Sequence, residues 1–500
     1  MIGTAPSLCP LGPGTYVLST WLFLRALGVV YFVAFASLAV QVHGLVGSRG
    51  ILPVAALCDP GNSPRWRQFL QLPTLCWWNT SDRFLMWLTW GGALLSLGLM
   101  VGLAPIPILA TLWLAYLSLV NACGVFLAYQ WDALLLETGL LAIFLAPREL
   151  LPTIPPTATP SPWARWLLVW LLFRLMFSSG VIKLRSRDPT WRNLSALQYH
   201  YETQPLPTPL SWYAHHLPAW FHRLSAAAMF VIELIVPFLV FAPAPLCYTA
   251  AAGIDALMVL IMATGNYGFF NVLTIALTLL LFDDAALIAL ASALRPGWRP
   301  PALATSAPLG WDLLTALVGL PLFGLSLDMM VRLFWRRGIP WPAPVARSLI
   351  RLAPYRLANG YGLFAVMTTE RPEIIVEGSR DGEHWHAYEF RWKPGTLTRR
   401  PRFVAPHQPR LDWQMWFAAL SSYYAHPWII TFLGRLLEGS PEVLRLLQHN
   451  PFPESPPPYV RALLYDYRFT SPALRRRTGA WWRRELIGLY LPPLGRWRGG

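Results

Sequence analysis

Long apolar segments separated by short polar connections fill the first two thirds of the chain. A helix rises about 1.5 Å per residue, so about 20 apolar residues cross the ~30 Å core of a bilayer. The segments of about this length are Leu18–Val42, Phe84–Leu103, Ile106–Tyr129, Trp163–Ile182, Leu224–Phe241, Leu246–Thr264, Phe269–Leu294 and Pro308–Phe334. The pattern predicts an α-helical polytopic membrane bundle of about eight to nine spans over residues 1–338.

Two segments leave the number of spans open. Phe269–Leu294 is interrupted by Asp283 and Asp284, so it is either one long span or a span followed by an interfacial helix. Trp131–Pro147 is short for a crossing and contains Asp132 and Glu137. It is either a full span or a re-entrant segment, and we favour the span.

Two polar connections, 43–82 and 183–222, are predicted to be structured loops. The second belongs to the longest polar stretch between apolar segments, and Pro205, Pro207 and Pro209 exclude a continuous helix through it. Its high aromatic content argues against disorder. We expect it to pack on the membrane face of the protein.

The pattern changes after residue 338. Short alternating segments at Leu363–Thr369, Glu373–Glu377, His384–Phe390, Tyr459–Phe469 and Trp481–Leu491 predict strands. Between them, Leu411–Leu420, Pro427–Leu437 and Pro441–Gln448 have the periodicity of amphipathic helices. Residues 339–500 are therefore predicted to form a small soluble domain of α+β or β-sandwich-like type.

The composition supports a membrane protein with basic surfaces. Charged residues make up 13% of the chain, about half of the roughly 25% found in soluble domains. The formal net charge is +15, and 25 of the 40 Lys and Arg residues fall at or after Arg332. Anionic lipid head groups are the expected partners of such a surface. Nucleic acid is disfavoured because no nucleic-acid-binding motif is found.

The cysteines do not have the spacing of a metal site, and the sequence predicts neither a metal nor another cofactor. Cys58 and Cys76 share one loop and could form a disulfide if that loop faces an oxidising compartment. Two free thiols are an equally good interpretation.

Several stretches of the chain have a recognisable sequence pattern: Gly44–Pro53, Tyr129–Pro147, Leu171–Leu184, Leu197–Pro218, Thr264–Leu277, Phe403–Leu420, His449–Pro453 and Val460–Thr470. Together they resemble the lipase maturation factor family. Each stretch is modest alone, but their order along nearly the whole chain is specific. The strong preference for Arg over Lys suggests a bacterial member.

The resemblance implies a membrane-embedded maturation factor that assists the folding or assembly of exported clients such as lipases. Animal members of the family reside in the endoplasmic reticulum membrane, and a bacterial member would reside in the cell (inner) membrane. The C-terminal domain is the part that the family links to client recognition. A distant likeness to the membrane part of vitamin K-dependent carboxylases supplies the alternative, a membrane enzyme that modifies a peptide or lipid. We favour the non-enzymatic function.

Ionisable residues inside membrane segments are candidates for function. Glu137 and Arg174 could form a pair within the bundle, either structural or lining a cavity. His200 and Glu202 are the other weak catalytic candidates, since His titrates near neutral pH. Interfacial packing is the favoured interpretation of this histidine-rich loop, and no catalytic motif is found.

Two polar and aromatic clusters of the C-terminal domain are candidates for client binding. Trp, Tyr and Arg dominate the energetics of protein interfaces. The clusters consist of Arg410, Asp412, Trp413 and Trp416, and of Arg461, Tyr465 and Tyr467. The alternative is that these residues tie the helices of the domain to its sheet.

The two structured loops and the C-terminal domain fall on one side of the membrane in a nine-span arrangement. All three are basic, and the positive-inside rule places them in the cytoplasm. The family resemblance places the C-terminal domain on the outer or lumenal side. We favour the second placement because long loops and domains follow the charge rule poorly.

Overall fold

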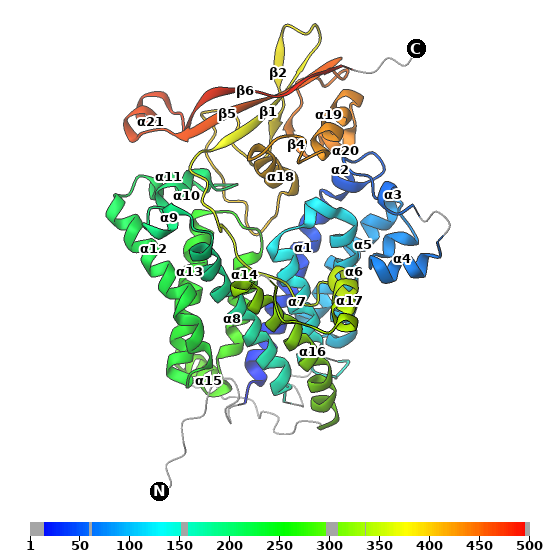
Figure 1. Ribbon diagram of the computed structural model, residues 1–500, viewed down its shortest axis with the longest axis vertical. Coiled ribbons are helices and arrows are strands. Elements are labelled where there is room, and N and C mark those ends of the chain that lie inside the picture. The colour runs from blue at the N-terminus through cyan, green and yellow to red at the C-terminus, as the bar shows by residue number, and fades with distance from the viewer. Residues whose placement is uncertain (1–14, 60–62, 152–158, 297–308, 336, 496–500) are drawn as a thin grey trace.

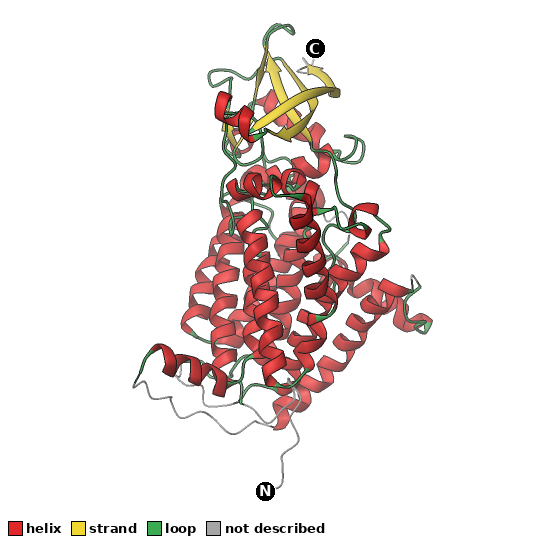
Figure 2. Ribbon diagram, turned by 90° about the vertical axis from the view of Figure 1, so that its left-hand side faces the viewer, coloured by secondary structure: helices red, strands yellow, loops and turns green. Residues whose placement is uncertain are grey.

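The structure is a computed structural model that describes residues 15–59, 63–151, 159–296, 309–335 and 337–495. Its first two thirds form a bundle of long helices, and its last third forms a smaller domain at one end of the bundle (Figure 1). Helices fill the bundle, and the strands of the main sheet lie in the smaller domain (Figure 2). This arrangement confirms the predicted fold class.

Seven helices of the described chain are long and apolar enough to cross a membrane. They are α1 (Val17–Ala39), α5 (Asp82–Val101), α6 (Pro105–Cys123) with the 3-10 helix η2 (Gly124–Leu127), α8 (Pro162–Arg185), α12 (Ala219–Leu234) with η3 (Val236–Phe241), α13 (Ala244–Thr264) and α16 (Leu309–Phe334). An eighth candidate span is a bent pair made of α14 (Phe270–Thr278) with η4 (Leu279–Leu281) and α15 (Asp284–Leu294).

The bent pair resolves the first open question of the sequence. Its two parts meet at 105°. Asp283 caps α15 by accepting a hydrogen bond from the N–H of Ala286. The carboxylate of Asp284 accepts the N–H groups of Val17 and Leu18 at 2.9 and 2.8 Å, and so caps α1. The two acids therefore start two helices instead of interrupting one straight span.

The short segment with Asp132 and Glu137 forms α7 (Gln130–Leu145) in the middle of the bundle. Its 16 residues cover about 24 Å at 1.5 Å per residue, less than the ~30 Å core. Both acids are buried. The segment is a largely buried central helix and is shorter than the candidate spans of the described chain, so a full crossing by it stays a prediction.

Both long polar connections contain short helices in the described chain. The first contains α2 (Val42–Val46), α3 (Val54–Leu57), α4 (Arg65–Gln71) and η1 (Leu75–Trp77), and the second contains α9 (Pro189–Arg192), α10 (Leu197–Thr203) and α11 (Pro209–His215). Proline occupies the first turn of α9 and of α11, where no backbone donor is needed. Both connections lie at the end of the bundle that carries the C-terminal domain (Figure 1).

The C-terminal domain is built on an antiparallel sheet of order β2-β1-β5-β6. Its strands are β1 (Pro372–Ser379), β2 (Trp385–Ala387), β5 (Tyr459–Phe469) and β6 (Trp482–Gly495), and a second pair joins β3 (Glu389–Phe390) to β4 (Leu447–His449). The helices are α18 (Arg410–Ala419), α19 (Trp428–Glu438), α20 (Pro441–Leu444) and α21 (Pro472–Thr478).

Three predicted elements differ in the structure. The predicted strand His384–Phe390 is divided into β2 of the main sheet and β3 of the second pair. The predicted strand Leu363–Thr369 is irregular, and the predicted helix Pro441–Gln448 ends at Leu444, before β4. The connection to the sheet passes through α17 (Ala343–Leu352) and η5 (Ala353–Tyr355), and then contacts the bundle through Asn359 and Tyr361. Backbone groups of this irregular segment are satisfied by side chains of the bundle instead of by a neighbouring strand.

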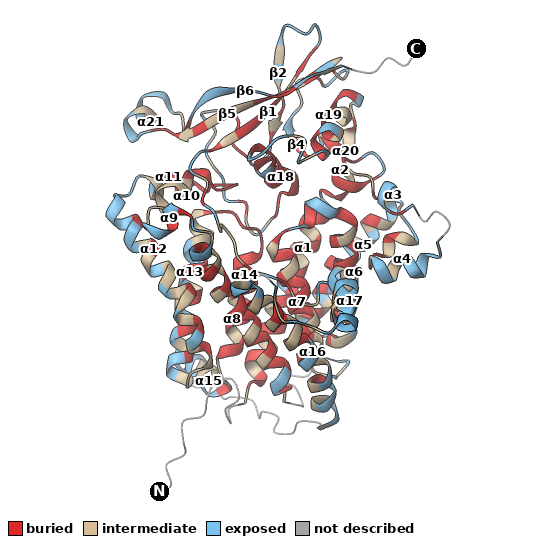
Figure 3. Cartoon of the chain, in the orientation of Figure 1, coloured by how far each residue is buried: buried red, intermediate tan, exposed pale blue. Residues whose placement is uncertain are grey.

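Buried residues continue from the centre of the bundle into the C-terminal domain without a break (Figure 3). One apolar cluster includes Tyr31 of α1, Leu134 of α7 and Leu411 of α18. The domain therefore packs on the bundle through a continuous core, and buried polar residues lie within this junction.

Candidate functional site

The predicted pair of Glu137 and Arg174 forms at the centre of the bundle, where both side chains are buried. Glu137 also accepts the N–H of Asn359 at 3.0 Å and the hydroxyl of Tyr361 at 2.7 Å. The guanidinium of Arg174 donates to the carbonyl of Asn359 at 3.2 Å. These contacts fix the segment after η5 to α7 and α8, which favours the structural interpretation over a catalytic one.

A second buried ion pair joins the bundle directly to the C-terminal domain. Arg410 of α18 donates two hydrogen bonds to the carboxylate of Asp132 in α7, at 2.5 and 2.8 Å. Tyr116 donates its hydroxyl to the same carboxylate. The Arg410 guanidinium also lies 5.4 Å from the ring centre of Tyr129. Arg410 and Asp132 are completely buried, so the domain cannot leave the bundle without exposing two charges.

Glu202 connects the second polar loop to β5. Its carboxylate accepts the N–H of Phe469 at 2.9 Å and a guanidinium hydrogen bond of Arg468 at 3.2 Å. The ring of His215 lies 3.7 Å from the same carboxylate. Burial lowers the pKa of His215, although Glu202 opposes the shift. Glu202 therefore acts as a bridge between loop and sheet.

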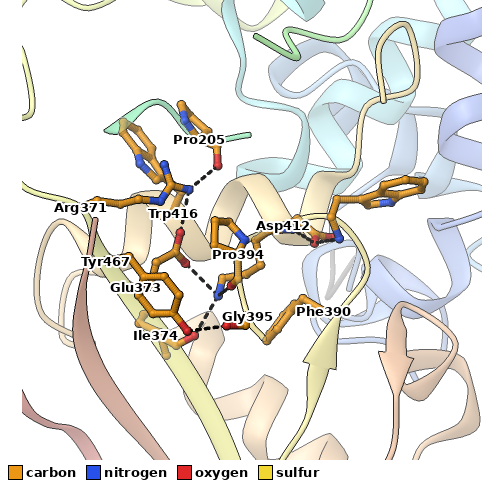
Figure 4. Close-up of polar contacts among 12 residues, drawn as sticks. Pro205, Arg371, Glu373, Ile374, Phe390, Pro394, Gly395, Asp412, Trp416 and Tyr467 are labelled. Carbon is orange, nitrogen blue, oxygen red and sulfur yellow. Dashed lines mark hydrogen bonds and ion pairs between the residues drawn. The ribbon is translucent and has the colours of Figure 1, made fainter. Parts of the chain in front are cut away.

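Figure 4 shows a charged cluster inside the C-terminal domain. Glu373 on β1 pairs with Arg371 at 2.7 Å and with Lys393 at 2.8 Å. Arg371 also donates to the carbonyls of Glu202 and Pro205 at 2.7 and 2.9 Å. Arg371, Glu373 and Lys393 are all buried. This cluster therefore binds the second polar loop to the first strand of the sheet.

The same close-up contains three of the predicted client-binding residues. Asp412 accepts the N–H groups of Trp392 and Lys393 at 2.8 and 2.9 Å, and burial raises its pKa. Trp416 donates its indole N–H to the carbonyl of Thr203 at 2.8 Å. Tyr467 donates its hydroxyl to the carbonyl of Gly395 at 2.8 Å. Each side chain holds one element of the junction to another.

Burial separates the seven predicted client-binding residues into two groups. Arg410, Asp412, Trp413, Trp416 and Tyr467 are buried. Arg461 and Tyr465 are partly accessible and lie on the sheet, where Arg461 pairs with Glu377 at 2.8 Å and Arg484 lies over the ring of Tyr465. A client reaches the first group only if the domain leaves the bundle, so client binding by these residues stays a prediction. The geometry favours the alternative that they tie elements together.

A cavity of about 350 Å³ lies beside these contacts, between α8, α12 and α13 and below the second polar loop. Lys183 and Glu233 line it and form a buried ion pair, with both carboxylate oxygens 2.8 Å from the ammonium nitrogen. His200 and Tyr267 line it as well, and their side-chain polar atoms are 3.3 Å apart. Burial lowers the pKa of His200 to about 4, so its ring is neutral at neutral pH.

The candidate residues do not form one catalytic set. His200 lines the cavity, whereas Glu137 and Arg174 are not among its described lining residues and bond to Asn359 and Tyr361. Glu202 faces β5. The structure thus distributes the residues of the enzymatic alternative over three separate places.

Glu233 was expected as an ionisable residue of a membrane segment, but neither its pairing with Lys183 nor a role for Lys393 was predicted, although a signal was available. The chain contains two lysines and 38 arginines. Both lysines, Lys183 and Lys393, form buried ion pairs with glutamates. In a chain that otherwise uses arginine at nearly every basic position, a rare lysine indicates a place that fits a compact ammonium group.

Cys58 and Cys76 are buried free thiols in the structure. Burial, followed by the neighbouring Cys76, raises the pKa of the Cys58 thiol to about 12. A disulfide between the two residues stays a prediction.

The fold and the buried junction define a class: a polytopic membrane protein whose C-terminal domain is held to one end of its helix bundle by buried ion pairs. Residues 18–289 match the lipase maturation factor transmembrane domain, and residues 357–492 match the lipase maturation factor C-terminal domain. The chain belongs to the lipase maturation factor family.

Individual relatives resemble the chain over nearly its whole length. Lipase maturation factor 2 of Homo sapiens and that of Rattus norvegicus are each 39% identical to it, over 94% of this chain and 82% of their own length. Lipase maturation factor 1 of Homo sapiens is 36% identical, over 98% of this chain and 90% of its own length. No solved structure matches the chain.

Proposed function

We propose that the protein assists the folding of exported client proteins, lipases among them, by binding an extended client segment along the outer edge of β6. The names of its relatives, which are called lipase maturation factors, support a lipase client. The observation that carries the proposal is the exposed apolar edge of the C-terminal sheet.

Strand β6 lies at one end of the sheet order, so no further described strand covers its outer edge. The strand is anchored at its first residue and past its middle, because Trp482, Tyr490 and Leu491 are buried. Between them, Leu486, Ile487 and Leu489 are 59, 56 and 54% exposed. An exposed, apolar edge strand is a template for pairing with another chain.

Strand addition fits a client that has not finished folding. An added strand is held by main-chain hydrogen bonds, so it needs little specific sequence, and the exposed side chains supply apolar contact. Arg483 and Arg484 lie on the same strand and are exposed. The preferred client segment is therefore extended, apolar and free of positive charge.

The experiment measures client binding and client activity together. A secreted dimeric lipase is diluted from denaturant into detergent-solubilised full-length protein. We expect the double variant Leu486→Glu and Leu489→Glu to weaken lipase binding at least tenfold and to lower recovered lipase activity. Phe403→Glu is the matched control, since Phe403 is 57% exposed in the same domain but outside β6. Equal binding by the double variant and the control would refute the β6 site.

We also propose that the C-terminal domain faces the exterior or the lumen, where exported clients fold. Both polar loops lie at the same end of the bundle as this domain (Figure 1), so a single measurement places all three. A reporter that is active only outside the cytoplasm is fused after residue 500. An active reporter is expected, and an inactive reporter in a well-expressed fusion would contradict contact with exported clients.

A further inference from the structure

The cavity between α8, α12 and α13 is not used by the proposed client binding. Its volume of about 350 Å³ falls within the ~300–1,000 Å³ of typical ligand pockets. Its walls are mainly aliphatic and aromatic, with Met176, Met258 and Phe364 among them. Such a space favours the apolar part of a ligand.

The polar groups in the wall leave no charge uncompensated among the described lining residues. Lys183 and Glu233 neutralise each other, and Lys183 also donates to the carbonyl of Ser179 at 3.2 Å. His200 is neutral at neutral pH because burial lowers its pKa. A charged head group would therefore find no unpaired opposite charge in the cavity wall. Its binding would carry a large desolvation cost.

One hydrogen bond in the cavity wall, between His200 and Tyr267, is weak enough for a ligand to replace it. The 3.3 Å separation between His200 Nε2 and the Tyr267 hydroxyl is long for a hydrogen bond to an O–H group. Tyr267 keeps a good partner in Gln204, to which it donates at 2.9 Å. A hydroxyl of a ligand can thus replace the weak contact to His200 without leaving Tyr267 unpaired.

The mouth of the cavity opens toward the lipid-facing side of the bundle. Leu217, Phe221 and Leu260 line the cavity and are also 41, 38 and 64% exposed. They lie near the beginning of α12 and the end of α13, two of the least buried candidate spans. A molecule dissolved in the adjoining leaflet reaches the cavity without crossing water.

We propose that this cavity binds a single-chain lipid with an uncharged hydroxyl-bearing head group, of the monoacylglycerol type, taken up sideways from the leaflet next to the C-terminal domain. The acyl chain fills the apolar space, and the head group hydrogen-bonds at His200 and Tyr267. The volume limits the ligand to one chain, and the neutral wall selects an uncharged head. The proposal does not depend on client binding at β6.

The test uses the full-length protein in detergent and three probes with the same chain: monooleoylglycerol, oleate and oleylamine. We expect saturable binding of monooleoylglycerol and at least tenfold weaker binding of the two charged probes. Ser225→Phe places a large side chain in the cavity wall and should weaken monooleoylglycerol binding at least tenfold. Ala228→Phe is the matched control, because Ala228 is exposed on the same helix and does not line the cavity. It should leave binding unchanged.

Two further variants keep the test informative if Ser225→Phe does not fold. Ala214→Phe fills the cavity from α11, and Tyr267→Phe removes the hydroxyl alone. We expect strong loss of binding for the former and several-fold loss for the latter. Absence of saturable monooleoylglycerol binding to the unmodified protein would overturn the proposal. So would equal binding of oleate, or the same loss in Ala228→Phe as in the cavity variants.

Discussion

The guanidinium of Arg410 and the carboxylate of Asp132 form a fully buried bidentate ion pair between residues 278 positions apart in the chain. Asp132 belongs to the central helix α7, and Arg410 begins the helix α18 of the C-terminal domain. Neither side chain is exposed to solvent, so each charge depends on the other for its compensation. The pair therefore makes the position of the C-terminal domain part of the folding of the bundle.

Removing one partner of this pair should destabilise the protein strongly. We expect Arg410→Ala to lower the free energy of unfolding by about 3–5 kcal/mol, because the buried Asp132 charge loses its partner. The matched control is Arg49→Ala, whose ion pair with Glu442 is 57% exposed on the arginine side. Such a pair contributes about 0–1 kcal/mol. Tryptophan fluorescence during denaturation in detergent measures both, and similar losses would contradict the role of Arg410.

The pair of Glu137 and Arg174 should show non-additive substitution effects. We expect Glu137→Gln to destabilise the bundle by about 3 kcal/mol, since it leaves the buried Arg174 charge unpaired. The double variant Glu137→Gln and Arg174→Met removes both charges and should be more stable than Glu137→Gln alone. Thermal unfolding of Glu137→Gln, Arg174→Met and the double variant gives the coupling energy. Strictly additive losses would show that the two side chains act independently.

A close helix contact predicts a rescue experiment. A Cβ added at Gly139 of α7 would clash with the hydroxyl oxygen of Tyr31 in α1. Gly139→Ala should therefore destabilise the protein by about 1–3 kcal/mol through overpacking. That hydroxyl has no hydrogen-bond partner in the described chain, so Tyr31→Phe removes the clash at little cost. Thermal unfolding should show recovery in the double variant, and no recovery would place the strain elsewhere.

His407 should make the docking of the C-terminal domain sensitive to acid. Its Nδ1 lies 2.9 Å from the hydroxyl oxygen of Ser37 in α1. Burial, then the nearby Arg410 and Arg391, lowers its pKa to about 4, against about 6.5 in an unfolded chain. The unfolded state therefore takes up the proton first as the pH falls.

The contribution of the neutral His407 ring to the free energy of unfolding is fully present above pH 6.5. It is lost as the pH falls from 6.5 toward 4. We expect a loss of about 2 kcal/mol over that window from His407. His407→Asn should flatten part of this profile. Limited proteolysis between the two domains at each pH measures docking. A profile unchanged in His407→Asn would contradict this role.

Some features of the fold follow from local sequence alone. The length of an apolar segment predicts a candidate span. A helix within the bilayer must form its own backbone hydrogen bonds, whichever helices surround it. Strand β5 appears over Tyr459–Phe469, the range predicted from its alternating pattern. The pairing of Glu137 with Arg174 was also predictable, since a bundle accepts few unpaired charges. Lys183 and Lys393 were visible as rare residues and Glu233 as an ionisable residue of a membrane segment, but the sequence did not indicate which lysine pairs with which glutamate.

Local patterns in the sequence were enough to predict the two-part architecture and the family, because these depend on apolar length, local periodicity and the order of short motifs. Only the tertiary structure decided that Leu363–Thr369 stays irregular beside the bundle and that α7 is enclosed by protein. It also decided that Arg410, Trp413 and Trp416 are buried. These outcomes have one physical reason, because each depends on partners that lie far away in the chain. A local pattern does not indicate which distant group will pair with a charge or complete a backbone hydrogen bond.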